Sequence, residues 1–310
     1  MAVLIAVVTC NGEATIGRTL KAALALDADA PVLVIDNASM DATIAVVGGM
    51  ENPRIRLNRN DENLGVGAAF NEALRHAKTM GAEWLMLLDQ DSEPAADALA
   101  VMREAALDPG DAGSRTSMRV AALFPTVRCR SHPDVIHYPM DWTGAGFSAV
   151  IPEEGQDVPG RLPVDTAISS GALYRVAALD AIGGFNEGYF IDFVDHECHL
   201  RLKNAGFGLW WVRGAEIRHD LGRIQKRTDS GLWIEHAPFR YYYMARNMIR
   251  GYWHFGGMRA LWGLIGEMRG HIRRLRENSA DAEACIAALR LGVVHGILGK
   301  TGKHPSCMRL

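Results

Sequence analysis

Val3-Leu4-Ile5-Ala6-Val7-Val8-Thr9-Cys10-Asn11-Gly12 is the stretch that decides the fold of this 310-residue chain. Its unbroken aliphatic run predicts a strand that is covered on both faces, as the strands of parallel sheets are. Similar runs that end in polar residues return at 32–37 and 84–91, with a shorter strand at 55–57, and segments with helical spacing separate them. This alternation predicts an α/β fold with a doubly wound, mostly parallel sheet and helices on both faces.

The rest of the chain continues this pattern and then becomes helical. We predict helices at 13–26, from about 41, at 66–78, from about 94 and at 195–205, and strands at 120–125, 166–174 and 209–212. Residues 108–119 are expected to be a loop, and 128–163 an irregular excursion or short hairpin. We divide the chain into a main domain at 1–237, with halves 1–125 and 126–237, and a basic helical extension at 238–310.

Charge is distributed unevenly along the chain. The net charge is -3, so composition indicates no nucleic-acid binder. Residues 213–276, however, hold 13 Lys and Arg against five acidic residues, a local net charge of +8. The five cysteines are odd in number and form no C-x-x-C pair, which fits neither a disulfide framework nor a structural zinc site. We therefore expect a cytoplasmic protein.

Two carboxylates, Asp89 and Asp91, directly follow the apolar run 85–88. One interpretation is a strand end whose Asp caps the helix expected from about Pro94. The other is a site for Mg²⁺ or Mn²⁺, held by carboxylate oxygens and shared with a diphosphate. Because ligands of such sheets bind beyond the carboxyl ends of the strands, we favour the metal.

Asp36 has an equivalent position after its own strand, where it can accept hydrogen bonds from a ribose or a base. Ser39 or Asp41 close by is explained equally well as a helix cap. No G-x-G-x-x-G follows the first strand, which argues against a dinucleotide fold.

A third cluster of polar residues lies at 190–202. Asp195 is either a helix cap or a general base that takes a proton from an attacking hydroxyl. Glu197 and Arg201 are four residues apart and can form an ion pair on the helix. His196 and His199, without a nearby thiolate pair, are a weak signal for zinc.

Taken in order, these motifs closely resemble the family 2 glycosyltransferases of the GT-A fold, and within them the bacterial rhamnosyltransferases that use dTDP-L-rhamnose. The resemblance covers roughly residues 3–250. It rests on Thr9-Cys10-Asn11, Asp36-Asn37-Ala38-Ser39-x-Asp41, Asn63-x-Gly65-x-Gly67-x-x-x-Asn71, Leu88-Asp89-Gln90-Asp91, Ser169-Ser170-Gly171, Gly183-Gly184-Phe185-Asn186-Glu187, 190–197 and Arg218-His219-Asp220-Leu221-Gly222.

The resemblance implies a role for each matched residue. Residues 1–125 would be the nucleotide-sugar-binding half and 126–237 the acceptor-binding half. Asp91 and His219 would hold the divalent cation, Mg²⁺ or Mn²⁺, and Asp195 would be the catalytic base. Val194 stands where the family has a second acidic residue, which leaves Asp192 and Glu197 as alternative bases. Donor-binding residues would be Thr9, Asn11, Asp36, Asn63, Gly65, Asp89, Gly171 and Arg246.

The implied reaction is an inverting transfer of L-rhamnose from dTDP-L-rhamnose to a hydroxyl of a glycan or a polyprenyl-linked glycan, in cell-surface polysaccharide synthesis. One carboxylate suffices for inversion, whereas a retaining double displacement would need a second, nucleophilic one. Alternatives are a UDP- or GDP-sugar donor, a nucleotidyltransferase, and a non-catalytic sugar-binding protein.

The basic extension admits two interpretations. Its aromatic and arginine residues, on opposite sides of a helix, suit an in-plane helix on an anionic membrane, which would place the protein on the inner face of the cell membrane. A helical cap or a homo-oligomer interface with a solvated basic edge is the alternative.

Overall fold

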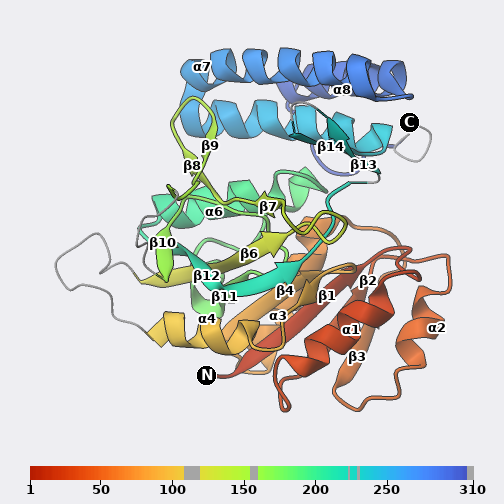
Figure 1. Ribbon diagram of the computed structural model, residues 1–310, viewed down its shortest axis with the longest axis vertical. Coiled ribbons are helices and arrows are strands. Elements are labelled where there is room, and N and C mark those ends of the chain that lie inside the picture. The colour runs from red at the N-terminus through yellow and green to blue at the C-terminus, as the bar shows by residue number, and fades with distance from the viewer. Residues whose placement is uncertain (108–118, 154–159, 223, 229–230, 306–310) are drawn as a thin grey trace.

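The computed structural model describes residues 1–107, 119–153, 160–222, 224–228 and 231–305. Its main sheet has the strand order β10-β12-β6-β11-β4-β1-β2-β3, and β5 and β7 pair with β12 and β6 (Figure 1). The strands are β1 (Val3–Thr9), β2 (Val32–Asp36), β3 (Ile55–Arg59), β4 (Trp84–Asp89), β5 (Glu93–Pro94), β6 (Val120–Arg128), β7 (Ile136–His137), β10 (Arg161–Pro163), β11 (Leu173–Arg175) and β12 (Gly208–Arg218). The loop predicted at 108–119 lies almost wholly outside the described residues.

The predicted, mostly parallel sheet is confirmed, with one reversed strand in its interior and the short antiparallel strands β5, β7 and β10 at its margins. β3, β2, β1 and β4 are mutually parallel, as are β6 and β12, whereas β11 is antiparallel to both β4 and β6. The strand predicted at 166–174 is wrong in extent, because the chain turns at Gly171, whose φ is +77°, and pairs only from Leu173. The helix expected from about Pro94 is also misplaced, because Pro94 pairs with Ile217 in β12.

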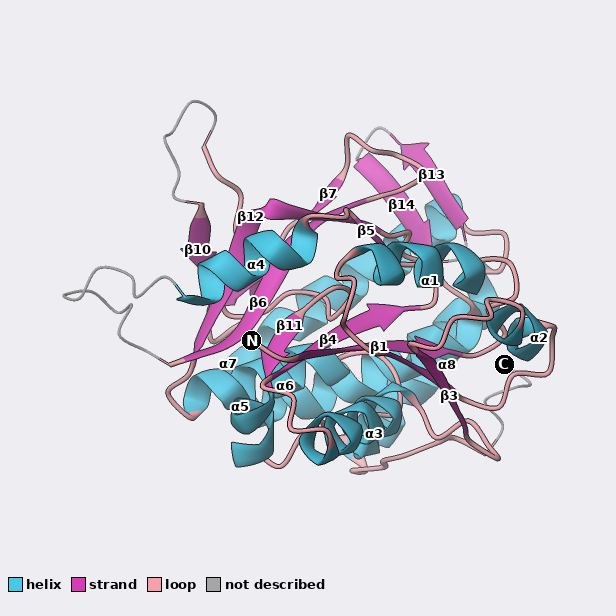
Figure 2. Cartoon of the chain, turned by 90° about the horizontal axis from the view of Figure 1, so that it is seen from below, coloured by secondary structure: helices cyan, strands magenta, loops and turns pink. Residues whose placement is uncertain are grey.

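Helices cover both faces of the sheet, because alternate residues of each buried strand point to opposite sides. On one side lie α1 (Ile16–Ala25), α2 (Thr43–Gly48) and α4 (Ala98–Leu107), packed on the odd-numbered residues of β1. On the other lie α3 (Val66–Thr79), α5 (Val176–Ala181) and α6 (Val194–Asn204), packed on its even-numbered residues. Figure 2 shows α1 and α4 opposite α3, α5 and α6.

The chain ends in a helical layer above this sheet. α7 (Pro238–Asn278) is broken at Gly257, with φ 58° and ψ -145°, and α8 (Ala282–Ile297) completes the layer (Figure 1). The break folds α7 back on itself, so that Tyr252 Oη donates hydrogen bonds to both oxygens of Glu267. The extension is therefore helical as predicted. No helix in the described parts of the chain combines the length and hydropathy needed to cross a membrane.

Two short hairpins complete the structure. β8 (Met140–Trp142) pairs with β9 (Phe147–Ala149), within the segment where a hairpin was predicted. β13 (Ile224–Thr228) pairs with β14 (Gly231–Glu235) directly before α7 and was not predicted.

Candidate active site

The carboxyl ends of three parallel strands bring the predicted polar residues together. β1, β2 and β4 end at Thr9, Asp36 and Asp89, and their registers pair Thr9 with Asp36 and Val8 with Asp89. Because neighbouring strands lie about 4.8 Å apart, the three side chains share one edge of the sheet. The polar residues that the sequence places at this edge therefore do lie together there.

Asp36 is fully buried at that edge. Its Oδ2 accepts a hydrogen bond from the backbone N–H of Ser39 at 3.1 Å. Its Oδ1 has no hydrogen-bond partner among the described residues. A buried carboxylate oxygen without a donor is costly, so this atom has the character expected of a ligand acceptor.

Thr9 and Asn11 are used within the protein. Thr9 Oγ1 donates to Gln90 Oε1 at 2.9 Å, and the Cys10 N–H donates to the same oxygen at 2.8 Å. Asn11 Oδ1 accepts from the Met40 N–H at 2.8 Å. Both predicted donor-binding residues therefore shape the edge of the sheet. Gln90, which lies between the two aspartates, was not singled out by the sequence.

Asn63 and Gly65 link the first half of the chain to the loop before α6. Asn63 Oδ1 accepts from the Gly65 N–H at 2.9 Å. Gly65 has a φ of +90°, and a Cβ there would lie 2.5 Å from the carbonyl oxygen of Phe190. The same oxygen accepts from the Val66 N–H at 2.6 Å. Only glycine permits this close approach.

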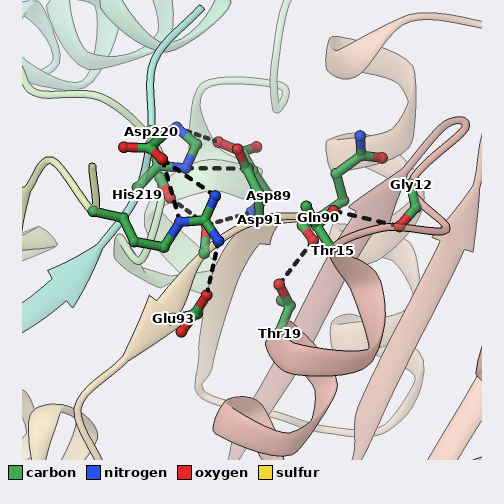
Figure 3. A network of polar contacts seen from close by, with 12 residues as sticks. Gly12, Thr15, Thr19, Asp89, Gln90, Asp91, Glu93, His219 and Asp220 are labelled. Atoms are coloured by element: carbon green, nitrogen blue, oxygen red, sulfur yellow. Dashed lines mark hydrogen bonds and ion pairs between the residues drawn. The ribbon is translucent and has the colours of Figure 1, made fainter. Parts of the chain in front are cut away.

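Asp89, Asp91 and His219 face one another across the end of β4 (Figure 3). His219 Nδ1 lies 3.1 Å from Asp91 Oδ1, and His219 Nε2 lies 3.7 Å from Asp89 Oδ2. Burial lowers the pKa of His219, but the Asp91 and Asp89 carboxylates raise it above its ordinary value. Burial raises the pKa of Asp89; His219 opposes that rise, whereas the negative charges of Asp91 and Asp195 add to it.

A second set of contacts holds these residues in place. Asp220, the neighbour of His219, accepts hydrogen bonds from the Ser131 N–H at 2.9 Å and from Arg130 Nε at 3.2 Å. Arg130 also lies 3.5 Å from Glu93 in β5, two residues after Asp91. Arg130 therefore bridges the segments that carry Asp91 and His219.

The geometry of Asp91 and His219 fits two ligands of one divalent cation. Two ligands that lie about 2.1 Å from an octahedral ion, at a right angle, are about 3.0 Å apart. His219 Nδ1 is buried and, although it lies 3.1 Å from Asp91 Oδ1, it forms no well-aligned hydrogen bond with the described residues. Within the same described ranges, no three His, Cys, Asp or Glu side chains are grouped to hold a metal ion by themselves. A cation here would therefore need oxygens from a ligand.

Asp195 stands in the first turn of α6. Its Oδ1 accepts from the His196 N–H at 2.8 Å, and its Oδ2 accepts from the Ser169 N–H at 3.3 Å. Its charge acts on Asp89, so the two carboxylates belong to the same site. In the described parts of the chain, no Lys or Arg lies within ion-pair distance of Asp195.

The two alternative bases are both paired with arginines. Asp192 receives hydrogen bonds from Arg240 Nε at 2.7 Å and Arg240 Nη2 at 2.5 Å. Glu197 is buried and receives two hydrogen bonds from Arg201 at 2.9 Å, the i,i+4 ion pair that the sequence predicted. A carboxylate held in this way is a poor proton acceptor, so the geometry favours Asp195.

The loop before α6 has an unusual backbone that α7 holds from outside. Phe190, Asp192 and Phe193 all have positive φ values of 63–64°. Asn247 Nδ2 donates to the carbonyl oxygens of Tyr189, Ile191 and Asp192 at 2.8–2.9 Å. Such strain persists only where the surroundings impose it, and here it directly precedes Asp195.

Two predicted donor-binding residues make contacts within the protein that give them a structural role. Arg246 is 1% exposed, and its guanidinium donates to Gly302 O at 2.6 Å and Tyr189 O at 2.8 Å, so it supports the backbone before α6. Gly171 donates its N–H to Leu87 O, and a Cβ there would collide with Ile217, so its role is packing. Arg240, absent from the predicted residues, instead acts electrostatically on Asp89 and Asp195.

Comparison with known sequences gives one family. Residues 4–183 match the family model described as "Glycosyl transferase family 2". N-acetylglucosaminyl-diphospho-decaprenol L-rhamnosyltransferase of Mycobacterium tuberculosis is 26% identical over 276 residues, which cover 80% of this chain and 85% of that protein. The dTDP-rhamnosyl transferase RfbF of Shigella flexneri is 26% identical over 219 residues, 70% of this chain and 68% of that protein.

Comparison with solved structures supports the same fold. The mannosyltransferase PcManGT from Pyrobaculum calidifontis, solved with GDP-Man and Mn²⁺, aligns with a TM-score of 0.56 at 17% identity. The alignment covers 95% of this chain and 84% of that one. At this identity the likeness establishes the fold, which is the GT-A arrangement that the sequence predicted.

Proposed function

The chain belongs to glycosyl transferase family 2, and from that premise we propose that it moves a sugar from a nucleotide-diphosphate donor to an acceptor hydroxyl with inversion. The observation that carries the proposal is the position of Asp195, a carboxylate without an arginine or lysine partner among the described residues, near Asp89 and the Asp91–His219 pair. The donor that we favour is dTDP-L-rhamnose, because one relative is named an L-rhamnosyltransferase and another a dTDP-rhamnosyl transferase.

Each part of the site has a task in this reaction. The orphan Oδ1 of Asp36 accepts a hydrogen bond from the nucleoside. Asp91 and His219 hold a divalent cation, which supplies positive charge for the leaving diphosphate. Asp195 takes the proton of the acceptor hydroxyl as its oxygen attacks the anomeric carbon. Arg240, whose charge reaches Asp89 and Asp195, adds a fixed positive charge beside them.

The donor is testable by thermal stability. With Mn²⁺ and dTDP-L-rhamnose at about 100 times its Kd, mass action stabilises the fold by about 2.7 kcal/mol, a rise in Tm of roughly 5 °C. The rise should disappear with EDTA. UDP- and GDP-sugars at the same concentration are the controls. If a UDP-sugar shifts the Tm and dTDP-L-rhamnose does not, the rhamnosyl assignment is wrong, although the family assignment stands.

The outer segment of α7, after Gly257, carries an exposed stripe that supports contact with an anionic membrane. The residues of this stripe are three or four positions apart, so they all lie on one face of the helix. That face is apolar towards the start of the segment and basic towards its end. Trp262 is 70% exposed. The sequence-based expectation of aromatic and basic residues on opposite sides is thus corrected. The stripe consists of Met258, Trp262, Ile265, Arg269, Arg273 and Arg276.

Vesicle binding tests this surface. We expect co-sedimentation with vesicles containing phosphatidylglycerol, and none with pure phosphatidylcholine. The double variant Arg269→Gln/Arg273→Gln should weaken binding at low salt by about 2 kcal/mol, roughly 30-fold, because each basic residue contributes about 1 kcal/mol. Arg75→Gln, an exposed arginine on α3, is the matched control. If the native protein, the double variant and Arg75→Gln bind the vesicles equally well, this stripe is not the membrane-binding surface.

A further inference from the structure

A chain of four side chains runs away from the catalytic carboxylate into the protein. Tyr174 Oη lies 2.7 Å from His199 Nε2, and His199 Nδ1 lies 2.9 Å from Thr166 Oγ1. Thr166 Oγ1 in turn lies 2.7 Å from Nδ1 of His196, the residue after Asp195. These contacts join β11, α6 and the segment before β11, and no step proposed above uses them.

The inner part of the chain is sealed from water. Tyr174, Thr166 and His199 are each 0% exposed. Burial, with a smaller contribution from His196, lowers the pKa of His199 well below its ordinary value, so its ring is neutral and carries one proton. Burial also raises the pKa of Tyr174, which keeps its phenolic proton.

Because buried polar groups must be hydrogen-bonded, the donor and the acceptor of each contact in this chain of side chains can be assigned. Among the described residues, the Tyr174 hydroxyl contacts only His199, so it must donate there or leave a buried proton unpaired. His199 Nε2 then accepts, and its single proton sits on Nδ1 and points to Thr166. Thr166 Oγ1 accepts this hydrogen bond from His199 and donates a hydrogen bond from its own hydroxyl to His196 Nδ1. His196, when neutral, therefore carries its proton on Nε2.

His196 Nε2 lies 3.9 Å from Asp195 Oδ1, too far for a direct hydrogen bond. One oxygen atom can, however, lie about 2.8 Å from both. A hydroxyl placed there gives its proton to Asp195 and accepts a hydrogen bond from the His196 Nε2–H. His196 is itself partly open, with 18% of its side chain exposed, and its ring centroid lies 5.1 Å from that of Phe147, with the two rings tilted by 38°.

We infer that Tyr174, His199 and Thr166 fix His196 as the neutral Nε2–H tautomer, and that His196 thereby orients the attacking hydroxyl at Asp195. The inference rests on the proposed glycosyl transfer. This inference also explains why Asp195, and not the adjacent His196, is the base. The Nδ1 lone pair of His196 is occupied by Thr166, and its Nε2 carries a proton, so the imidazole cannot compete with Asp195 for the hydroxyl proton.

The tautomers are observable without turnover. Long-range ¹H–¹⁵N NMR correlations of the ring nitrogens, assigned with His196→Gln and His199→Gln, should show an Nδ1–H tautomer for His199 and an Nε2–H tautomer for His196. Thr166→Val should leave His196 as a mixture of tautomers, whereas Thr166→Ser, which keeps the hydroxyl, should retain the native pattern. Tyr174→Phe removes the hydroxyl that donates to His199 Nε2, so both tautomers of His199 should then be populated.

Hydrolysis of dTDP-L-rhamnose, with water in place of the acceptor, gives the kinetic readout. Thr166→Val should lower kcat about tenfold and leave the donor KM unchanged, because the lost interaction concerns the attacking oxygen. Thr166→Ser should restore the native rate. An Nδ1–H tautomer of His196 in the native protein, or an unchanged His196 spectrum in Thr166→Val, would overturn the inference. Native tautomers with no hydrolysis would instead refute dTDP-L-rhamnose as the donor of the proposed reaction and leave the tautomer assignment standing.

Discussion

Asp195→Asn is expected to reduce sugar transfer by about 10²–10⁴-fold while donor binding is retained. The amide has nearly the same shape, and its oxygen can still accept the His196 N–H, although its NH2 group cannot accept the longer bond from the Ser169 N–H. The first turn of α6 should therefore be preserved. It cannot take the proton of the acceptor hydroxyl. Donor Kd by calorimetry and the rate of donor turnover together measure the two effects.

The control for this experiment is a carboxylate of the same type outside the site. Asp180→Asn removes an exposed charge that pairs with Lys78 on the surface, and it should leave turnover unchanged. Asp192→Asn should instead disturb the loop before α6, because it removes a charge from the Arg240 pair. Near-native turnover in Asp195→Asn would refute the base assignment, and loss of donor affinity would give this residue a binding role.

Asp91→Ala is expected to abolish the dependence of donor affinity on Mn²⁺. The variant removes one of the two protein ligands proposed for the cation and leaves His219 with only the more distant carboxylate of Asp89 at this edge. Donor affinity with Mn²⁺ should fall by about 100-fold or more, about 2.7 kcal/mol, because the diphosphate then lacks its counter-charge. Affinity in EDTA should change little. Titration calorimetry with and without Mn²⁺ separates the two conditions.

Asp97→Ala serves as the matched control, since Asp97 is exposed, lies six residues further along the chain and precedes α4. It should behave like the native protein in both conditions. A native Mn²⁺ effect in Asp91→Ala would show that the cation is held elsewhere or is not needed. Equal donor affinity of the native protein with Mn²⁺ and EDTA would likewise exclude the proposed metal site.

The local part of the structure was predictable from the sequence. The apolar runs of β1, β2 and β4 can be recognised as strands from the sequence, because a strand buried on both faces must be continuously apolar. The rule that ligands bind beyond the carboxyl ends then places Asp36, Asp89 and Asp91 together. The i,i+4 pair of Glu197 and Arg201 also follows from spacing alone.

The errors share one physical cause, which is dependence on residues far away in the sequence. Pro94 looks like the start of a helix, but it pairs with Ile217 in β12. Arg246 looks like a phosphate ligand, but carbonyl oxygens of the loop before α6 surround it. Gln90 and Arg240 carry no motif of their own. Their roles arise only when the fold brings Thr9 of β1 beside Gln90 and Asp192 beside Arg240.

The hold of α7 on the loop before α6 has a consequence for protein engineering. A chimera joined at 237/238, with the helical layer of another protein, would keep Asp192 and lose Arg240, leaving a nearly buried carboxylate without its counter-ion. It would also lose the Asn247 amide that supports three carbonyl groups of the strained backbone. The helical layer and the sheet are therefore exchangeable only as one unit.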